Sequence, residues 1–278
     1  MILLRRGALG DVVLLGAVTA QVPGCTVVTD ARYVGLARRL RGVAHVVPWP
    51  EIPPGDVVDL QGSWRSWRLA PGAPRVHKHS VRRRLRLVLR NLTARPPVPA
   101  IYARALGVMP APPPWIDVPA RPRDALALLP GAAYAPKRWD AARFAELGRA
   151  WAGPVVVLGG PGEEGLVAEV TRQIPGAASV VEAGFDATID ALAGCRVAVG
   201  GDTGLLHLAG ACGVPLVALF GPTHPSDGFF VYPGEVVQRD RWCRPCTLHR
   251  RERCPLGHNA CMDLPVEAVL AAVRRCAG

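Results

Sequence analysis

Lysine is scarce in this chain of 278 residues, because only Lys78 and Lys137 are lysines among its 33 basic residues. A lysine that falls inside a motif is therefore unusually informative. Long apolar runs are also missing, since no stretch reaches the ~20 residues that a membrane-spanning helix needs. Internal repeats and low-complexity tracts are absent from the sequence. Any association with a membrane should therefore be peripheral.

Half of the residues are apolar, which is enough to bury a sizeable core and excludes a disordered chain. The length corresponds to about two domains of ~150 residues. Eight cysteines would suggest disulfides in a short secreted protein, but this chain is long and its cysteines gather late. We therefore expect a cytoplasmic protein. The alternative is a signal peptide over residues 1–20, but Asp11 would place a carboxylate inside its apolar segment.

Short apolar runs alternate with segments of helical spacing, and glycine or proline follows most of the runs. This rhythm is typical of parallel sheets and predicts an α/β fold. Six prolines within residues 109–123 interrupt the pattern, so we expect domains over 1–120 and 121–278. Two doubly wound domains bind ligands in a cleft between them, at the carboxyl ends of their strands. The expected strands are residues 2–4, 26–28, 57–60, 126–129, 155–158, 197–199 and 216–220.

The opening segment ILLRRGALGDVVLLGAV has the pattern of a strand that runs into Gly7 and Gly10 and then into a helix. Glycines allow the backbone and a substrate to approach closely. Asp11 in the first helical turn has two interpretations. It stabilises the helix dipole, or it is a general base that deprotonates a hydroxyl at the end of the strand. The segment is not a complete GxGxxG motif, so dinucleotide binding is only weakly supported.

A second candidate site lies in VAVGGDTGLLHLAGACGVPLVALFGPTHP, where a strand ends and a helix begins. Asp202 is a suitable N-cap for that helix. The free amides of Thr203, Gly204 and Leu205 at the helix start could hold a diphosphate. His207, one turn further along, could bind the same phosphates or stabilise a leaving group. The alternative is a core histidine whose hydrogen bonds are already satisfied.

A third candidate site is the loop in LLPGAAYAPKRWDAARFAEL, which joins a strand to a helix capped by Asp140. Phe144, Leu147 and Trp151 are spaced to lie on the buried face of that helix. Lys137 stands where a loop at the end of a strand enters the cleft. In a chain with so little lysine, this position favours a contact with phosphate. The alternative is a solvated charge on a loop.

Four segments in this order resemble the bacterial heptosyltransferases of glycosyltransferase family 9. They are GALGDVVL, DLQGSWRS at residues 59–66, PGAAYAPKRW, and GGDTGLLHLAGACGVPLVALFGPTHP. The resemblance spans most of the chain. It implies a GT-B fold, in which Rossmann-like domain 1–120 binds the acceptor and Rossmann-like domain 121–278 binds the nucleotide sugar. It also implies an inverting, metal-independent transfer of heptose from ADP-heptose to the lipopolysaccharide inner core, with Kdo-lipid A or a heptosyl glycolipid as acceptor.

The resemblance also suggests a role for each matching position. Asp11 is similar to the catalytic base. No cofactor is then required for catalysis, because the helix start and Lys137 neutralise the departing diphosphate. Either Glu163 or Glu164 is similar to the acid that contacts the ribose. The other expected donor-binding residues are Lys137, Asp202, Thr203, Gly204 and His207, and the expected acceptor-binding residues are Gly10, Gln61, Arg82, Arg83 and Arg84.

Positive charge is concentrated in residues 75–95, which hold seven arginines, Lys78 and no acidic residue, in a chain of net charge +11. The apolar residues of this stretch share one helical face, which predicts an amphipathic helix. The simplest interpretation is a solvated surface helix. We expect instead contact with a phosphorylated glycolipid acceptor and with the anionic inner face of the inner membrane. Nucleic acid is not expected as a partner, because no nucleic-acid-binding motif is present.

Four cysteines gather in the spacing C-x2-C-x7-C-x6-C, at Cys243, Cys246, Cys254 and Cys261. In a cytoplasmic protein this spacing is typical of a metal site, and we expect a structural zinc ion that takes no part in catalysis. Reduced thiols, disulfides and an iron–sulfur cluster are the alternatives. A final helix is expected over residues 266–275. The remaining cysteines should be small core residues: Cys25, Cys195, Cys212 and Cys276.

Two other functions remain open. One is a family 9 transferase that serves another surface polysaccharide. The other is a protein that binds a sugar nucleotide or an anionic lipid without catalysis. The presence of Asp11 and Lys137 together with residues 202–207 favours an enzyme, because binding alone does not need a base.

Overall fold

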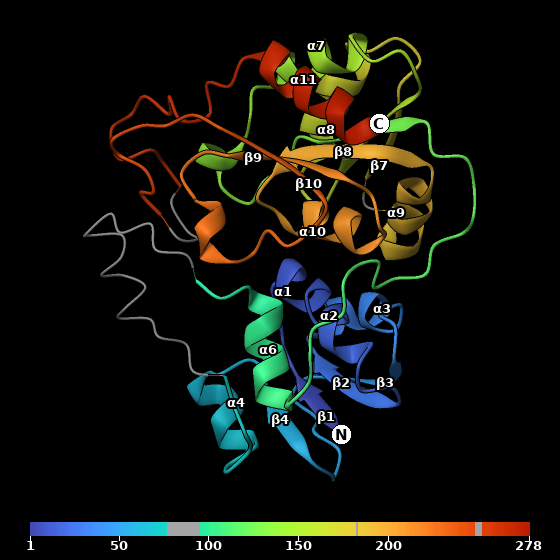
Figure 1. Cartoon of the computed structure of the whole chain (residues 1–278), viewed down its shortest axis with the longest axis vertical. Coiled ribbons are helices and arrows are strands. Elements are labelled where there is room, and N and C mark those ends of the chain that lie inside the picture. Colours follow the sequence, from blue (N-terminus) through green and yellow to red (C-terminus); the bar gives the residue numbers. More distant parts are fainter. Residues whose placement is uncertain (77–94, 182, 248–251) are drawn as a thin grey trace.

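The structure is a computed structural model that describes residues 1–76, 95–181, 183–247 and 252–278. It contains two parallel sheets, each in its own lobe of the molecule. In Figure 1 the lobe built from the N-terminal part of the chain lies below the lobe built from the C-terminal part. The expected α/β architecture of two doubly wound domains is therefore confirmed.

The N-terminal sheet has the strand order β3-β2-β1-β4, with all neighbours parallel. Strand β1 is central and all three of its residues are buried, as expected for a strand covered on both faces. The strands are β1 (Ile2–Leu4), β2 (Cys25–Thr29), β3 (Val43–Pro48) and β4 (Val57–Asp59). The helices of this lobe are α1 (Leu9–Val13), α2 (Gly16–Thr19), η1 (Ala31–Tyr33), α3 (Val34–Ala37), α4 (Trp64–Leu69) and α6 (Val98–Leu106).

The C-terminal sheet has the order β10-β9-β8-β5-β6-β7, again with all neighbours parallel. Its strands are β5 (Ala125–Leu129), β6 (Val155–Gly159), β7 (Ala178–Val181), β8 (Cys195–Gly201), β9 (Leu216–Phe220) and β10 (Gly234–Gln238). Its helices are η2 (Ala135–Lys137), α7 (Ala141–Arg149), α8 (Glu164–Arg172), α9 (Gly184–Ala193), α10 (Gly204–Ala211), η3 (Pro225–Asp227) and α11 (Val266–Ala277).

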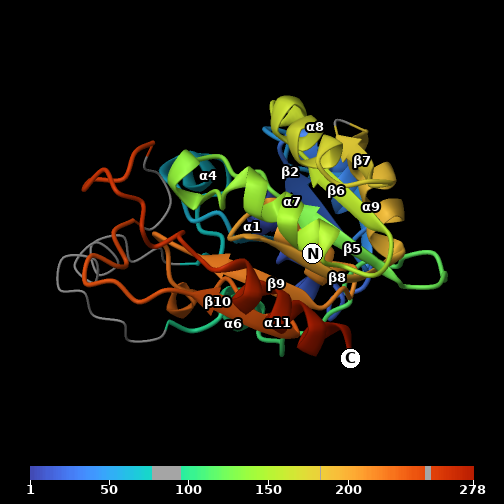
Figure 2. The ribbon, with the colours of Figure 1, turned by 90° about the horizontal axis from the view of Figure 1, so that it is seen from above.

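Two helical layers cover the C-terminal sheet. Helices α7, α8 and α11 share one apolar cluster with the strands and lie on the outer face, which Figure 2 shows from above. Helices α9 and α10 lie on the other face, and their buried residues belong to a second cluster that continues into the N-terminal lobe. The core of the molecule is therefore continuous across the domain boundary.

Each sheet reverses its strand order beside its first strand, between β1 and β4 and between β5 and β8. In open parallel sheets, ligands bind outside the carboxyl ends of the strands at such a reversal. The segments that follow these four strands contain Asp11, Gln61, Lys137 and Asp202. The topology thus gathers residues that are far apart in the sequence at two reversals of strand order.

The two lobes meet where helix α1 packs against helix α10. A β carbon added at Gly204, the first residue of α10, would lie 2.7 Å from the β carbon of Leu9. The proline-rich linker is bound to helix α10 beside this contact. The backbone N–H of the buried Trp115 donates to the Ala211 carbonyl at 2.8 Å. The ring of Trp115 lies 5.4 Å from that of Tyr232. Residues 107–124 form no helix or extended strand, as the prolines predicted.

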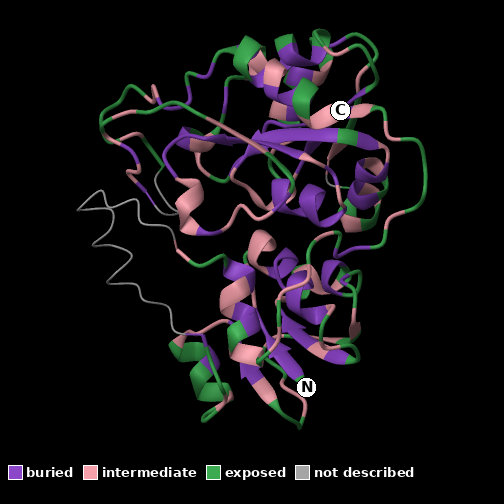
Figure 3. Ribbon diagram, viewed as in Figure 1, coloured by how far each residue is buried: buried purple, intermediate pink, exposed green. Residues whose placement is uncertain are grey.

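The expected strands all exist, with ends that differ by two residues at most. Three strands were not expected: β3, β7 and β10. They lie at the sheet edges and carry no fully buried run, whereas most residues of the central strands are buried (Figure 3). Edge strands lack the continuous apolar signal because solvent reaches part of their surface.

Candidate active site

Asp11 lies in the first turn of α1, directly after central strand β1. Its carboxylate accepts a hydrogen bond from the Ala8 amide at 3.2 Å and forms an ion pair with Arg5. The Arg5 side chain is almost fully buried and donates from Nη1 to the Leu60 carbonyl at 2.9 Å. The Asp11 side chain keeps 21% of its surface exposed. A carboxylate held by a buried cation and still reachable from solvent can accept a proton.

Asp59, at the end of β4, organises the neighbouring loop. Its Oδ1 accepts hydrogen bonds from the backbone amides of Gln61 and Gly62, both at 2.9 Å, and its Oδ2 accepts one from the Ser66 hydroxyl at 2.8 Å. Gln61 in turn accepts the amide of Arg6 at 3.2 Å. Sequence reasoning named Gln61 and missed Asp59, although a carboxylate directly after an apolar run was a usable signal.

Tyr102 of α6 borders the Arg5–Asp11 pair. Its ring lies 5.8 Å from the Arg5 guanidinium carbon. Burial raises the pKa of the Tyr102 hydroxyl well above its usual value, Arg5 lowers it in part, and Asp11 raises it further. The hydroxyl is therefore neutral, so the ion pair is enclosed by an uncharged aromatic wall. The sequence contained no signal for this residue.

Lys137 and Asp202 join the carboxyl ends of β5 and β8. Lys137 Nζ lies 2.9 Å from Asp202 Oδ2, and Thr223 Oγ1 donates to the same oxygen at 3.2 Å. Burial alone would raise the pKa of Asp202, but Lys137, His207 and these hydrogen bonds outweigh it and lower the pKa. The Lys137 side chain is only 12% exposed, so the alternative of a solvated loop charge is wrong. Thr223 stands inside the FGPTHP motif, yet the sequence did not single it out.

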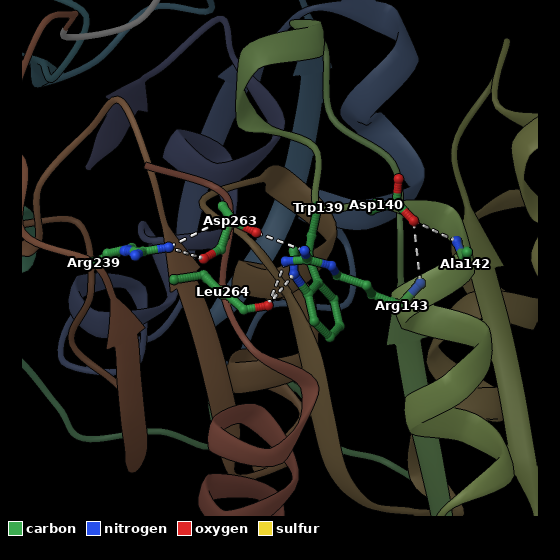
Figure 4. A network of polar contacts seen from close by, with 7 residues as sticks. All are labelled: Trp139, Asp140, Ala142, Arg143, Arg239, Asp263 and Leu264. Atoms are coloured by element: carbon green, nitrogen blue, oxygen red, sulfur yellow. Dashed lines mark hydrogen bonds and ion pairs between the residues drawn. The ribbon is translucent and has the colours of Figure 1, made fainter. Parts of the chain in front are cut away.

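The segment that carries Lys137 is anchored in the core. Trp139 is buried, and its Nε1 donates to the Leu264 carbonyl at 3.0 Å. Arg143 donates to the same carbonyl at 2.8 Å, as Figure 4 shows. Asp140 caps α7 as expected, because its side chain accepts hydrogen bonds from the first-turn amides. Lys137 therefore projects from a short, fixed segment.

The N-cap of α10 is Thr203, whose hydroxyl accepts from the Leu206 amide at 3.5 Å. The expectation that Asp202 caps this helix is wrong, because Lys137 and Thr223 hold its carboxylate. Gly204 begins the helix, and its Cα faces Leu9 of the other lobe.

His207 is buried one turn into α10, and its Nε2 lies 3.9 Å from Asp202 Oδ1. Burial lowers its pKa, Asp202 and Asp11 oppose that effect, and Lys137 adds to it. The ring is therefore neutral near pH 7. Its buried Nδ1 has no hydrogen-bond partner among the residues that the structure describes. His207 is thus not a satisfied core histidine, and it lies within electrostatic range of both Asp202 and Asp11.

Glu163 and Glu164 follow β6, and their side chains point in different directions. The Glu163 carboxylate accepts the Gly160 amide at 2.8 Å and fills the space beside Gly131, in the loop after β5. The exposed Glu164 instead accepts the Gly162 amide at 2.7 Å. Only Glu163 faces the loop that leads to Lys137.

Other predicted residues lie outside this site or outside the described part of the chain. Arg82, Arg83, Arg84 and most of the basic stretch lie outside the described residues. Within the described part of the chain no cysteine forms a disulfide, and no three His, Cys, Asp or Glu side chains are gathered to hold a metal ion. Cys25, Cys195 and Cys212 are buried core residues as expected, and burial raises their pKa values to about 11, 12 and 12. Cys276 is partly buried against the outer helices.

The sequence profile described as Glycosyltransferase family 9 (heptosyltransferase) matches residues 110–255, more than half of the chain. The chain belongs to glycosyltransferase family 9. This family match includes the Lys137 segment, Glu163 and the whole of α10.

Relatives and solved structures agree with the family 9 assignment. Lipopolysaccharide heptosyltransferase 2 of Escherichia coli is 36% identical over 114 residues, which are 37% of this chain and 33% of that protein. A family 9 glycosyl transferase from Veillonella parvula has a TM-score of 0.76 at 18% identity, covering 99% of this chain and 96% of that one. Heptosyltransferase WaaC of E. coli, solved with ADP, has a TM-score of 0.69 at 17% identity and covers 99% and 98%. These structures show that the fold is GT-B.

The matches to curated relatives cover only part of each protein. The matched part of the chain spans half or less of the length of the first curated relatives. A more distant neighbour of the same fold, the iron-containing dodecameric glycosyltransferase TibC of enterotoxigenic E. coli, has a TM-score of 0.62 at 14% identity and covers 99% of this chain and 75% of its own. Among the described helices, none is long and apolar enough to cross a membrane.

Proposed function

We propose that this chain is an inverting glycosyltransferase that moves heptose from ADP-heptose to the lipopolysaccharide inner core without a catalytic metal ion. One observation carries the proposal. The Asp11 carboxylate of the N-terminal domain and the Lys137–Asp202 pair of the C-terminal domain both border His207, at the contact of α1 with α10. A displacement at an anomeric carbon needs a base on the acceptor side and positive charge on the diphosphate side.

The donor half of the site supports a nucleoside diphosphate sugar. The start of α10 offers backbone amides and the positive end of a helix dipole to the phosphates. Lys137, now paired with Asp202, has its ammonium group beside that helix start and can turn to a phosphate oxygen. Asp202 then keeps the Thr223 hydroxyl as its partner. Glu163, after the neighbouring strand, would accept hydrogen bonds from the ribose hydroxyls. The related WaaC structure was solved with ADP, which supports ADP as the nucleotide.

The acceptor half supports base catalysis. Asp11 takes the proton of the acceptor hydroxyl while that oxygen attacks the anomeric carbon and the bond to the diphosphate breaks. The configuration at the anomeric carbon inverts, and ADP leaves. Arg5 fixes one carboxylate oxygen of Asp11, so the group is oriented before the acceptor arrives. Gln61, held by the Asp59 network, borders the same strand end and is available to bind an acceptor hydroxyl.

The outer surface of the N-terminal domain suits an anionic membrane. Helix α4 exposes Trp64 and Trp67, which are 64% and 46% exposed, together with Arg65 and Arg68. Tryptophan is enriched at membrane–water interfaces, and arginine is attracted to anionic headgroups. This supports a peripheral position at the inner face of the inner membrane, where a phosphorylated glycolipid such as Kdo-lipid A is accessible. Substituting both tryptophans with alanine should reduce binding to anionic vesicles, and unchanged binding would contradict this contact.

A donor screen tests the proposed function. Binding of ADP, UDP and GDP is measured by calorimetry on the native chain and on Lys137→Met, with Arg149→Met on the exposed face of α7 as a matched control. We expect ADP to bind most tightly and Lys137→Met to weaken it at least tenfold, because a charge-assisted phosphate contact contributes ~1.5–3 kcal/mol. Equal affinity in the native chain and Lys137→Met would contradict the donor site.

Turnover decides between the remaining functions. ADP release is followed with ADP-heptose and Kdo-lipid A or a heptosylated glycolipid. Release that depends on both substrates supports the proposal. Release with a different sugar or acceptor would assign the chain to another surface polysaccharide. Tight binding of ADP-heptose without release, over a panel of acceptors, would indicate a non-catalytic binding protein and overturn the proposal.

A further inference from the structure

The four late cysteines surround one small cavity between β10 and α11. Cys243, Cys246, Cys254 and Cys261 all line it, and its volume is about 10 Å³. That is about the space that a single water molecule requires. Cys261 is buried and lies within electrostatic range of the other three. The four cysteines that the spacing singled out therefore border one cavity.

The backbone after Cys254 forms a tight turn. The turn closes through the Gly257 amide, which donates to the Cys254 carbonyl at 3.0 Å, and Asn259 adopts a left-handed conformation with φ of 44°. Amide donors in such a turn would orient a metal-bound thiolate.

A buried cation beside the cavity lacks a matching anion. Arg244 is 7% exposed and donates to the carbonyls of Gly221, Arg239 and Thr223. Asp240 is the carboxylate that it pairs with, but that pair is 4.0 Å long and Asp240 is fully exposed. A buried charge is costly unless it is paired. Arg244 and Arg253 line the same cavity as the four sulfurs, so anionic sulfur there would supply the missing countercharge.

We propose that Cys243, Cys246, Cys254 and Cys261 bind one thiolate-preferring transition-metal ion, zinc or iron, in tetrahedral geometry. Four thiols release four protons when a divalent ion binds, and the resulting centre carries a charge of about −2 that faces Arg244 and Arg253. The described side chains are not yet gathered at coordination distance. Metal–sulfur bonds of ~2.3 Å would draw the four sulfurs together.

The metal loop also holds part of the donor site. The Cys246 amide donates to the Pro222 carbonyl at 3.1 Å, and Arg244 donates to the Thr223 carbonyl at 3.0 Å. Thr223 is the residue whose hydroxyl supports Asp202. At the end of the loop nearest α11, Asp263 forms ion pairs with Arg239 at 2.8 Å and with Arg143 at 2.6 Å (Figure 4). The ion would therefore fix the loop around Thr223, a role that rests on the proposed donor site.

Metal content tests the site without reference to activity. The full chain is expressed in medium containing zinc and iron, purified without a chelator, and analysed by plasma mass spectrometry. We expect one metal ion per chain, with visible absorption only if it is iron. Cys254→Ser should lose the ion, whereas Cys276→Ser, a cysteine outside the loop, should keep it. Eight reactive thiols with no metal, after reconstitution with zinc and with ferrous iron under reducing conditions, would overturn the proposal. A loss of two mass units per cysteine pair would instead indicate disulfides and would also overturn it.

ADP affinity tests the coupling to Thr223. Removing the metal with a chelator under reducing conditions should weaken ADP binding about tenfold, and restoring the ion should recover it. An unchanged ADP affinity would contradict the coupling to Thr223 but not the metal site itself. If the metal-loaded chain binds no nucleotide at all, the proposed function fails while the measured metal content still decides the site.

Discussion

Gly10 and His207 lie against one another across the boundary between the two domains. A β carbon at Gly10 would lie 2.5 Å from Cδ2 of His207. Gly10 stands directly before Asp11, and His207 stands one turn after the helix start that faces the donor. The absence of a side chain at Gly10 therefore sets how closely the proposed acceptor and donor halves of the site approach.

Replacing Gly10 with alanine should separate the two halves. Overpacking at a close contact costs ~1–3 kcal/mol, and the neighbouring Asp11 would be displaced from His207. We expect lower thermal stability and a fall in kcat/KM of at least tenfold. Gly35→Ala is the matched control, because a β carbon at Gly35 in α3 meets nothing within 4 Å. If Gly10→Ala behaved like Gly35→Ala in both measurements, the tight contact would not matter.

Replacing Lys137 with methionine should destabilise the folded chain. The Asp202 pKa is held below its usual value, so the pair contributes stability above about pH 4 that is lost as the pH falls further. Breaking a buried ion pair by removing one partner costs ~3 kcal/mol at the lower end of the measured range. Urea unfolding at pH 7 should show this loss for Lys137→Met and almost none for Arg149→Met. Equal midpoints for the two variants would contradict the buried pair.

His207 should make folding sensitive to mild acid. Its pKa is lowered in the folded state, so its contribution to stability is present above about pH 6.5 and is lost as the pH falls through the folded value. The free energy of unfolding, measured from pH 8 down to pH 5, should decline less steeply in His207→Gln than in the native chain. Parallel curves for the native chain and His207→Gln would refute the assignment.

The two adjacent glutamates provide a matched pair of variants. Glu163→Gln should weaken ADP binding about tenfold, because a carboxylate that accepts ribose hydroxyls forms charge-assisted hydrogen bonds worth ~1.5–3 kcal/mol. Glu164→Gln should change it by less than twofold, since the Glu164 carboxylate lies on the exposed side of the turn. Calorimetric titration with ADP compares them. The opposite order would mean that the ribose lies on the other side of this loop.

The sequence predicted the central elements of the fold well, because their signal is strong. Strands β1 and β9 were predicted with their observed ends, and both are buried along their length. Strands β3, β7 and β10 were missed because partial exposure breaks their apolar runs. The two-domain arrangement followed from the alternation of strands and helices and from the proline-rich linker.

The sequence indicated several residues of the proposed site, but not their contacts. Asp11, Lys137 and Asp202 each follow a strand of the predicted sheets, so sequence position alone indicated them. The partner of each carboxylate depends on tertiary packing, and for this reason the sequence assigned Asp202 to a helix cap and missed Thr223. The proposal of Glu163 rather than Glu164 likewise rests on tertiary packing, because the Glu163 carboxylate lies beside Gly131.

The turnover of Asp11→Asn tests the central claim most directly. ADP release from ADP-heptose with a Kdo-lipid A acceptor is measured alongside ADP affinity, with Asp56→Asn on the exposed turn before β4 as the control. The account predicts a fall in kcat of ~10²–10⁴ for Asp11→Asn, with ADP affinity unchanged, because a general base contributes that much to the rate and does not bind the donor. Native turnover in Asp11→Asn would contradict it.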